Sequence, residues 1–167
     1  MKLEILKYPD PRLSLKAQPV DKYDGSLHQL LDDMAETMYA AEGIGLAAPQ
    51  VGKSLRLFVI DLGEHGESSG KLMEFINPVL SRGEGTTTFE EGCLSVPGVT
   101  EEVDRFENIT ISFQDRNGKA QEMMAQGLLA VALQHENDHL DGVLFVEKLS
   151  PMKRRLIKKK LQKAVTL

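Results

Sequence analysis

The chain has 167 residues, of which 41% are hydrophobic, and a formal net charge of −5. A chain of this length usually forms one domain that buries roughly two thirds of its unfolded surface. The acidic balance gives no reason to expect DNA or an anionic membrane as a partner. The longest apolar runs, such as residues 57–60, are too short to span a bilayer, and the first residues lack the apolar core of a signal peptide. We therefore expect a single-domain cytoplasmic protein.

An amphipathic helix is the first predicted element. Ser26 and Gln29 have the spacing of a capping box, and Gly43 marks the expected end of the helix. His28 lies in the first turn, where we expect it to be solvated rather than to bind a ligand. Five apolar residues are spaced so that they lie on one face of this helix: Leu27, Leu30, Leu31, Met34 and Met38.

The segment GIGLAAPQVG, residues 43–52, superficially matches a dinucleotide-binding fingerprint in the spacing of its glycines. That fingerprint needs a strand before it and a helix that opens within it. Here a helix is predicted before the segment, Pro49 interrupts it and a strand follows. Two interpretations remain: a tight connection without a ligand, or an extended loop whose backbone binds an extended peptide, with Gln50 as an added amide donor.

Strand-like runs follow at residues 55–61, 72–77 and 109–113. The last of them alternates apolar and polar residues and leads into Asp-Arg-Asn-Gly at 115–118, which predicts an antiparallel hairpin. Residues 65–71, HGESSGK, are expected to form a surface loop.

Two further helices are predicted towards the C-terminus. The first runs from about Gln126 to Leu140, and the second has Ser150 as its N-cap and Pro151 at its first position. An order of helix, strands, helix and helix indicates an α+β protein.

His135 and His139 lie on the first of these two helices, with Glu136 beside the first histidine. Their separation corresponds to about 400° on an α-helix, so both imidazoles point the same way and can bind one metal ion. A short match of this kind also arises by chance in roughly one of a few hundred such chains. A catalytic divalent metal usually takes three protein ligands and leaves one position for water, so the interpretation depends on a third ligand.

The known zinc peptidase motifs do not supply a third ligand in this sequence. The position where an extended zinc peptidase motif has its last histidine is Phe145, and the downstream carboxylates Asp141 and Glu147 lie too near the end of the same helix. Cys93, within EEGCLSVPG, is the main candidate and would complete a Cys-His-His site; His65 is the alternative. A lone cysteine is more often an inert core residue, and that interpretation also stays open.

Three segments in this order, GIGLAAPQVG, EGCLSVPG and QHENDHLDG, resemble the signature motifs of the peptide deformylase family, and the similarity extends from residues 8–13 to 149–151. The resemblance implies the α+β fold of that family, with antiparallel or mixed β-sheets around a central metal-binding helix. It implies one domain, with a catalytic core at 1–149 and a basic C-terminal helix at 150–167. It also implies removal of the N-formyl group from the N-terminal formylmethionine of newly synthesised polypeptides, with release of formate.

The resemblance implies a role for each matching position. Three residues are expected to bind the metal: Cys93, His135 and His139. Three groups are expected to carry out the chemistry: Glu136 as general acid and base, and Gln50 and the backbone N–H of Leu94 as oxyanion donors. Six residues are expected to contact the substrate, the first three along its backbone and the others around its methionine side chain: Gly43, Ile44, Gly45, Glu91, Leu128 and Val131. For Leu128 and Val131 a role in the core is equally natural, because they share a helix with His135. The family implies Fe²⁺, although Cys and His ligands suit Zn²⁺, Ni²⁺ and Co²⁺ as well.

The last predicted helix is strongly basic within an acidic protein. Seven residues carry its charge: Lys153, Arg154, Arg155, Lys158, Lys159, Lys160 and Lys163. They are expected either to form a solvated helix face or, as the resemblance favours, to dock on ribosomal RNA. Met152, Leu156 and Ile157 are expected to anchor this helix to the core. Two other functional classes remain as alternatives: a metallopeptidase, and a non-catalytic metal-bound module that docks on a partner.

Overall fold

A computed structural model describes residues 1–63 and 71–166, with side chains up to residue 161. The α-helices are α1 (Gly25–Ala40), α2 (Gly127–Leu140) and α3 (Pro151–Thr166). Short 3₁₀ helices are η1 (Pro11–Ser14), η2 (Ala48–Val51) and η4 (Phe145–Lys148). The strands are β1 (Gly45–Ala47), β2 (Leu57–Ile60), β3 (Met73–Glu84), β4 (Thr87–Cys93), β5 (Val96–Arg105), β6 (Asn108–Gln114) and β7 (Ala120–Gln126). None of the helices in the described part is both long and apolar enough to cross a membrane.

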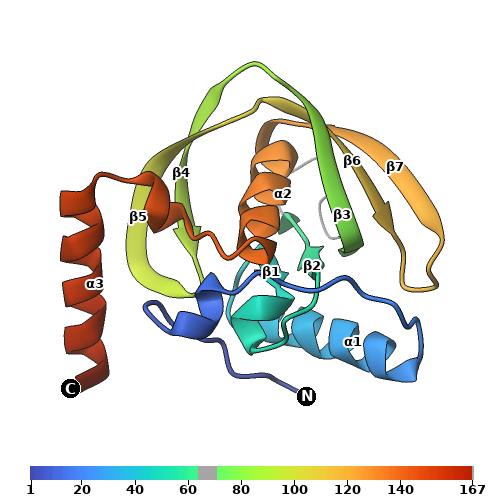
Figure 1. Ribbon diagram of the computed structural model, residues 1–167, viewed down its shortest axis with the longest axis horizontal. Helices are drawn as coiled ribbons and strands as arrows, with labels where there is room; N and C mark the ends of the chain where they lie inside the picture. Colours follow the sequence, from blue (N-terminus) through green and yellow to red (C-terminus); the bar gives the residue numbers. More distant parts are fainter. Residues whose placement is uncertain (64–70, 167) are drawn as a thin grey trace.

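The strands form two sheets, and every pairing between these strands is antiparallel. Five strands lie in the order β1-β2-β3-β6-β7, and β4 pairs with β5 in a separate hairpin. Figure 1 shows α2 between the two sheets, with α1 below it and α3 outside the β4–β5 hairpin. The predicted α+β class is therefore confirmed, with the histidine-bearing helix at its centre.

Helix α2 is enclosed because its first turns are apolar on several faces. Ala130, Val131 and Leu133 are almost fully buried, and Leu140 closes the other end of the helix. A helix that is apolar over most of its circumference is stable only inside the core. Several of these residues pack against Phe58, Ile60 and Phe75 of the large sheet, among others. This packing fixes the position from which the helix presents its polar residues.

The N-terminus of α1 differs from the expected capping box. The N-cap is Asp24, whose carboxylate accepts hydrogen bonds from the backbone N–H groups of Ser26 and Leu27. Gln29 donates instead to Asp33 at 2.8 Å. A carboxylate satisfies two of the free N–H groups that open a helix, so the aspartate takes this position. His28 is also not simply solvated, because its Nε2 lies 2.8 Å from the carbonyl oxygen of Arg116.

One prediction for the strands is confirmed, one predicted strand is longer than expected and one hairpin was not predicted. The β6–β7 hairpin forms as expected, with Gly118 at a φ of 83° in its turn. The run at 72–77 is the start of a longer strand, β3, whose pairing with β6 is interrupted by register shifts. The β4–β5 hairpin was not predicted, because its outer face is charged and hides the strand pattern. The expected loop at 65–71 lies outside the described residues except for Lys71.

Helix α3 begins as predicted, since Ser150 Oγ accepts a hydrogen bond from the N–H of Lys153 at 3.3 Å. Its anchoring residues differ from the expected set. Ile157 and Leu161 are buried against the hydrophobic cluster beneath β5, whereas Met152 and Leu156 are 72% and 61% exposed. Helical geometry explains the difference, because Ile157 and Leu161 are one turn apart on one face while the other two lie on another face.

Candidate metal centre

The turn between β4 and β5 brings Cys93 to the two histidines of α2. Cys93 pairs with Val96, so Leu94 and Ser95 form a two-residue turn at the end of the hairpin. Cys93 Sγ lies 3.4 Å from His139 Nε2, which lies 3.3 Å from His135 Nε2. All three donor atoms are within 4.8 Å of one another. The main candidate for a third ligand is therefore beside the other two; His65 lies outside the described residues.

These distances fit a single metal ion. Ligand atoms that bind one ion at about 2.1 and 2.3 Å, with tetrahedral angles, lie roughly 3.4 to 3.6 Å apart. The spacings from the His139 donor to the Cys93 and His135 donors, 3.4 and 3.3 Å, are close to these values. One thiolate and two imidazoles suit a divalent transition metal and leave a fourth position open.

A buried carboxylate fixes the orientation of His135. Glu91 Oε1 lies 2.9 Å from His135 Nδ1. Burial favours the neutral form of Glu91, but hydrogen bonds from Arg105 and His135 outweigh it and lower the pKa of Glu91 to about 2. An ionised carboxylate can only accept, so the hydrogen is on Nδ1 and the lone pair of Nε2 is free for a metal.

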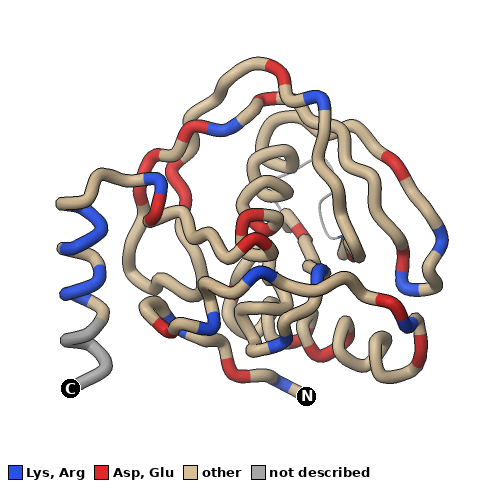
Figure 2. The backbone as a smooth tube through the Cα atoms, viewed as in Figure 1, with Lys and Arg blue, Asp and Glu red and all other residues tan. Residues whose placement is uncertain are grey.

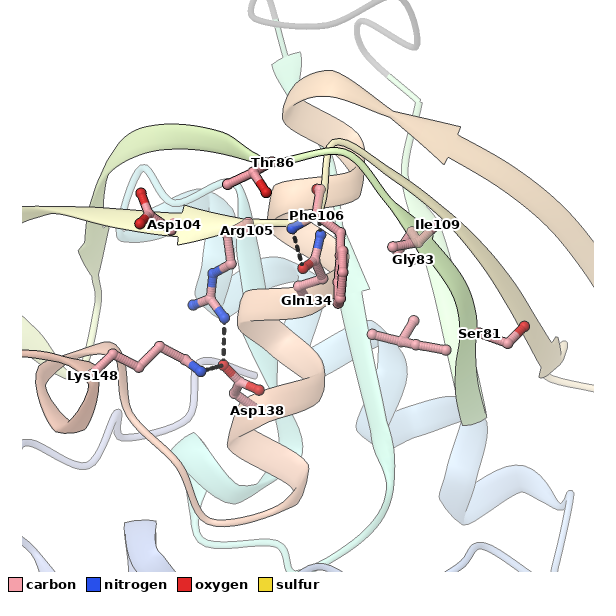
Figure 3. A pocket seen from close by; sticks show the side chains of 11 residues that line it. Ser81, Gly83, Thr86, Asp104, Arg105, Phe106, Ile109, Gln134, Asp138 and Lys148 are labelled. Atoms are coloured by element: carbon pink, nitrogen blue, oxygen red, sulfur yellow. Dashed lines mark hydrogen bonds and ion pairs between the residues drawn. The ribbon is translucent and has the colours of Figure 1, made fainter.

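Arg105 in turn holds Glu91. Its Nε and Nη2 each donate to the Glu91 carboxylate at 2.9 Å, and Nη1 donates to Asp138 on α2. Figure 3 shows Asp138 between Arg105 and Lys148, on the side of α2 where a second pocket opens. The Arg105 side chain is only 4% exposed, so these carboxylates compensate a positive charge that has little access to water. The network links β4, β5 and α2 behind the metal ligands.

Glu136 is buried and follows His135, one of the candidate ligands, on α2. It is 4% exposed, and burial raises its pKa to about 7. Its Oε1 has no hydrogen-bond partner among the described residues. Its Oε2 would be 2.6 Å from a Cβ placed on Gly45. Gly45 therefore lacks a side chain for a structural reason: any larger residue would displace the Glu136 carboxylate.

Gln50 faces the same centre from η2. Its Oε1 accepts from the backbone N–H of Ala47 at 2.9 Å, which leaves the amide nitrogen directed at the hairpin turn. That nitrogen donates to Ser95 Oγ at 3.1 Å and lies 3.5 Å from Cys93 Sγ. Gln50 and Leu94, which follows Cys93 in the turn, thus lie next to the donor atoms.

A cavity of about 630 Å³ opens beside the centre. All six residues expected to contact a substrate line it: Gly43, Ile44, Gly45, Glu91, Leu128 and Val131. Strand β1 is an edge strand that pairs only with β2 among the described strands. An edge strand beside a cavity can accept an extended peptide through its backbone.

The enclosed helix, the Cys-His-His cluster and the adjacent carboxylate are typical of a metal-dependent enzyme. The chain matches the polypeptide deformylase family over residues 2–155 and belongs to that family. The peptide deformylase of Chromobacterium violaceum is 52% identical over 161 residues, which cover 96% of this chain and 95% of that protein.

Solved structures agree over almost the whole chain. A peptide deformylase from Legionella pneumophila has a TM-score of 0.92 and 47% identity, covering 99% of this chain and 96% of its own. The peptide deformylase of Ehrlichia chaffeensis in complex with actinonin has a TM-score of 0.93 and 41% identity, covering 98% and 97%. The expected family and fold are thereby confirmed.

Some residues around the centre had no local signal in the sequence. Arg105 holds Glu91 and also donates to Asp138, and Ser95 is fully buried against Gln50. In the sequence nothing distinguishes Arg105 from an exposed charged residue of a strand. Its burial depends on two carboxylates that are distant in the sequence, those of Glu91 and Asp138. Ser95, two residues after Cys93 within the EEGCLSVPG segment, was the one of these residues that lay in a segment already singled out.

Proposed function

We propose that the Cys93–His135–His139 centre carries out the reaction of the peptide deformylase family on this chain. The enzyme removes the N-formyl group from the N-terminal formylmethionine of newly synthesised polypeptides and releases formate, in the cytoplasm where these chains are made. The observation that carries the proposal is the convergence of one thiolate and two imidazoles beside a buried carboxylate and a peptide-sized cavity.

The three ligands fit one divalent metal ion, and we propose Fe²⁺, with Zn²⁺, Ni²⁺ or Co²⁺ as substitutes that the same donors accept. Such an ion would lower the pKa of a water molecule towards neutrality and polarise the formyl carbonyl. Glu91 keeps His135 in the tautomer that a metal requires, and Arg105 keeps Glu91 ionised and in place.

Glu136 acts as the general base and acid. It takes a proton from the attacking water and passes it to the nitrogen of the leaving amine. A carboxylate with a pKa of about 7 is suited to both steps, since the free energies of its two protonation states are similar near neutral pH. The residue is not needed as a ligand, so its role is separable from metal binding.

Gln50 and Leu94 stabilise the oxyanion. The amide nitrogen of Gln50 and the N–H of Leu94 lie on segments that meet at Cys93, and both donate to the oxygen that becomes negative in the transition state. The substrate backbone runs along Gly43, Ile44 and Gly45, as a strand added to the free edge of β1. Its methionine side chain lies among Leu128, Val131 and the walls of the cavity near Glu91.

Replacement of Gln50 with alanine is expected to lower kcat by roughly a hundredfold or more, because it removes one oxyanion donor. Steady-state kinetics on formyl-Met-Ala-Ser measures the effect. A change confined to KM would contradict the prediction and make Gln50 a contact of the ground state.

The function itself is tested by offering formyl-Met-Ala-Ser and an unblocked peptide to the metal-loaded protein. Release of formate from the first supports deformylation. Cleavage of an internal bond would instead support a metallopeptidase, and no reaction with either peptide would support a non-catalytic metal-bound module.

We further propose that residues 1–149 form the catalytic core and that α3 docks the enzyme on ribosomal RNA. Figure 2 shows basic residues along the described part of α3. Lys158, Lys159 and Lys160 are exposed while Ile157 and Leu161 hold the helix on the core. Contacts between such a face and phosphates weaken steeply as the salt concentration rises.

Reversing the charge of two lysines, Lys158→Glu with Lys159→Glu, is expected to abolish co-sedimentation with ribosomes at low salt and to leave turnover of the formyl-tripeptide unchanged. Point changes are preferable to deleting the helix, because deletion would uncover the cluster that Ile157 and Leu161 close. Lys16→Glu with Lys22→Glu is the matched control, since it makes the same charge change at exposed positions elsewhere. Equal sedimentation of the α3 variant and the control would rule out docking through α3.

A further inference from the structure

The segment Leu6–Tyr8 connects the two parts of the chain that carry the proposed oxyanion donors. The N–H of Leu6 donates to the carbonyl oxygen of Gln50 at 2.7 Å. The N–H of Tyr8 donates to the carbonyl oxygen of Ser95, also at 2.7 Å. One short segment is therefore hydrogen bonded both to η2 and to the β4–β5 turn.

Side chains alternate along this segment. Leu6 is 6% exposed and belongs to the hydrophobic cluster beneath β5, against which Tyr8 and Cys93 also pack. Lys7 is exposed and is among the residues that line the cavity of the metal centre. The cluster fixes the segment from one side, and Lys7 reaches the site from the other.

The ammonium group of Lys7 donates to the carbonyl oxygen of Leu94 at 3.1 Å. Lys7 and Tyr8 therefore hold the carbonyl groups of Leu94 and Ser95, the two residues of the turn. Turns of this length exchange between types by rotating their central peptide, which here is the Leu94–Ser95 peptide. A donor on the Leu94 carbonyl opposes that rotation.

The Leu94–Ser95 peptide adjoins both proposed oxyanion donors. The N–H of Leu94 belongs to the preceding Cys93–Leu94 peptide, which shares the Leu94 Cα, and Ser95 Oγ accepts the hydrogen bond from the amide nitrogen of Gln50. A shift at Leu94 or Ser95 would therefore reach the donors on both sides of this peptide. Lys7 is also the one lysine or arginine among the described residues that line this cavity, where the carboxylates of Glu42, Glu90, Glu91 and Glu136 are found.

We infer that Lys7 is a positioning residue for deformylation: its ammonium group holds the Leu94 peptide, and with it the alignment of Leu94 and Gln50 on the oxyanion. The inference rests on the proposed function and adds a residue to its machinery. Lys7 acts through the turn, so its removal is expected to change kcat rather than KM. Metal content is expected to stay the same, because Cys93 is held independently by the pairing of β4 with β5.

The test compares Lys7→Met with Lys7→Arg in the full-length, metal-loaded enzyme acting on formyl-Met-Ala-Ser. Methionine keeps much of the apolar stem and removes the donor, whereas arginine keeps a cationic donor. Lys7→Met is expected to lower kcat by roughly tenfold, as for a donor moved slightly out of alignment, with unchanged KM, metal content and Tm. Lys7→Arg is expected to recover most of the loss. Lys2→Met, at another exposed lysine of the N-terminal segment, is the matched control.

Each outcome decides a different point. If wild-type protein releases no formate, the proposed function fails and the inference fails with it. If the wild type is active and Lys7→Met has an unchanged kcat, only the inference is overturned. A rise in KM alone would make Lys7 a substrate contact, and an equal loss of activity in Lys7→Arg would exclude the ammonium contact as the cause; both results overturn the positioning role.

Discussion

Replacing Glu136 with alanine is expected to leave the metal bound and to lower turnover by at least about a hundredfold, the usual contribution of a positioned acid and base. The three atoms proposed to bind the metal come from other residues, so the variant leaves them in place. What the variant loses is a carboxylate that is almost fully buried, with a pKa raised by that burial to about 7. Formate release and metal content, measured on the same preparation, separate the two effects.

A second variant, Glu136→Gln, keeps the volume beside Gly45 and removes only the ability to transfer the proton. It is expected to be as inactive as the alanine variant. Glu84→Ala, which removes an exposed carboxylate at the end of β3, is the matched control and should retain full turnover. Near-normal turnover of either Glu136 variant with metal bound would refute the acid and base role.

The parts of the fold that could be predicted from the sequence are those with a local signal. The spacing of His135 and His139 fixes their common direction once α2 forms, and the apolar residues before them account for its burial. The turn signal at 115–118, which ends at Gly118, likewise predicts the β6–β7 hairpin from residues that are close in the sequence. Each of these predictions depends only on residues that are close in the sequence, within about two turns of a helix or within one hairpin.

The remaining features depend on contacts that no local pattern encodes. β4 and β5 carry charged residues on their outer face, so the pairing that delivers Cys93 to α2 had no strand pattern to reveal it. Arg105 becomes a buried residue only because Glu91 and Asp138 approach it from two other elements. Lys7 reaches Leu94 across 87 positions of the sequence. Periodicity cannot report such contacts. The whole-chain resemblance indicated Cys93 and Glu91, but neither Arg105 nor Lys7.

Replacing Cys93 with alanine is expected to abolish stoichiometric metal binding. His135 and His139 would remain one turn apart on α2, but two imidazoles bind a divalent ion much more weakly than three ligands held by a fold. The structure should tolerate the change, because the backbone of Cys93 stays paired with Val96 and only a partly buried thiol is lost.

Metal content after dialysis, with the unfolding temperature as a check on the fold, measures the effect of Cys93→Ala. Glu136→Ala is the informative companion, since it is expected to keep the ion and lose the activity, whereas Cys93→Ala is expected to lose both. A Cys93→Ala protein that keeps tightly bound metal and full turnover would remove Cys93 from the ligand set and return His65 as the candidate for the third ligand. If the two variants instead differ as expected, binding of the ion and transfer of the proton are separate tasks of neighbouring residues, one fixed by the β4–β5 turn and the other by α2.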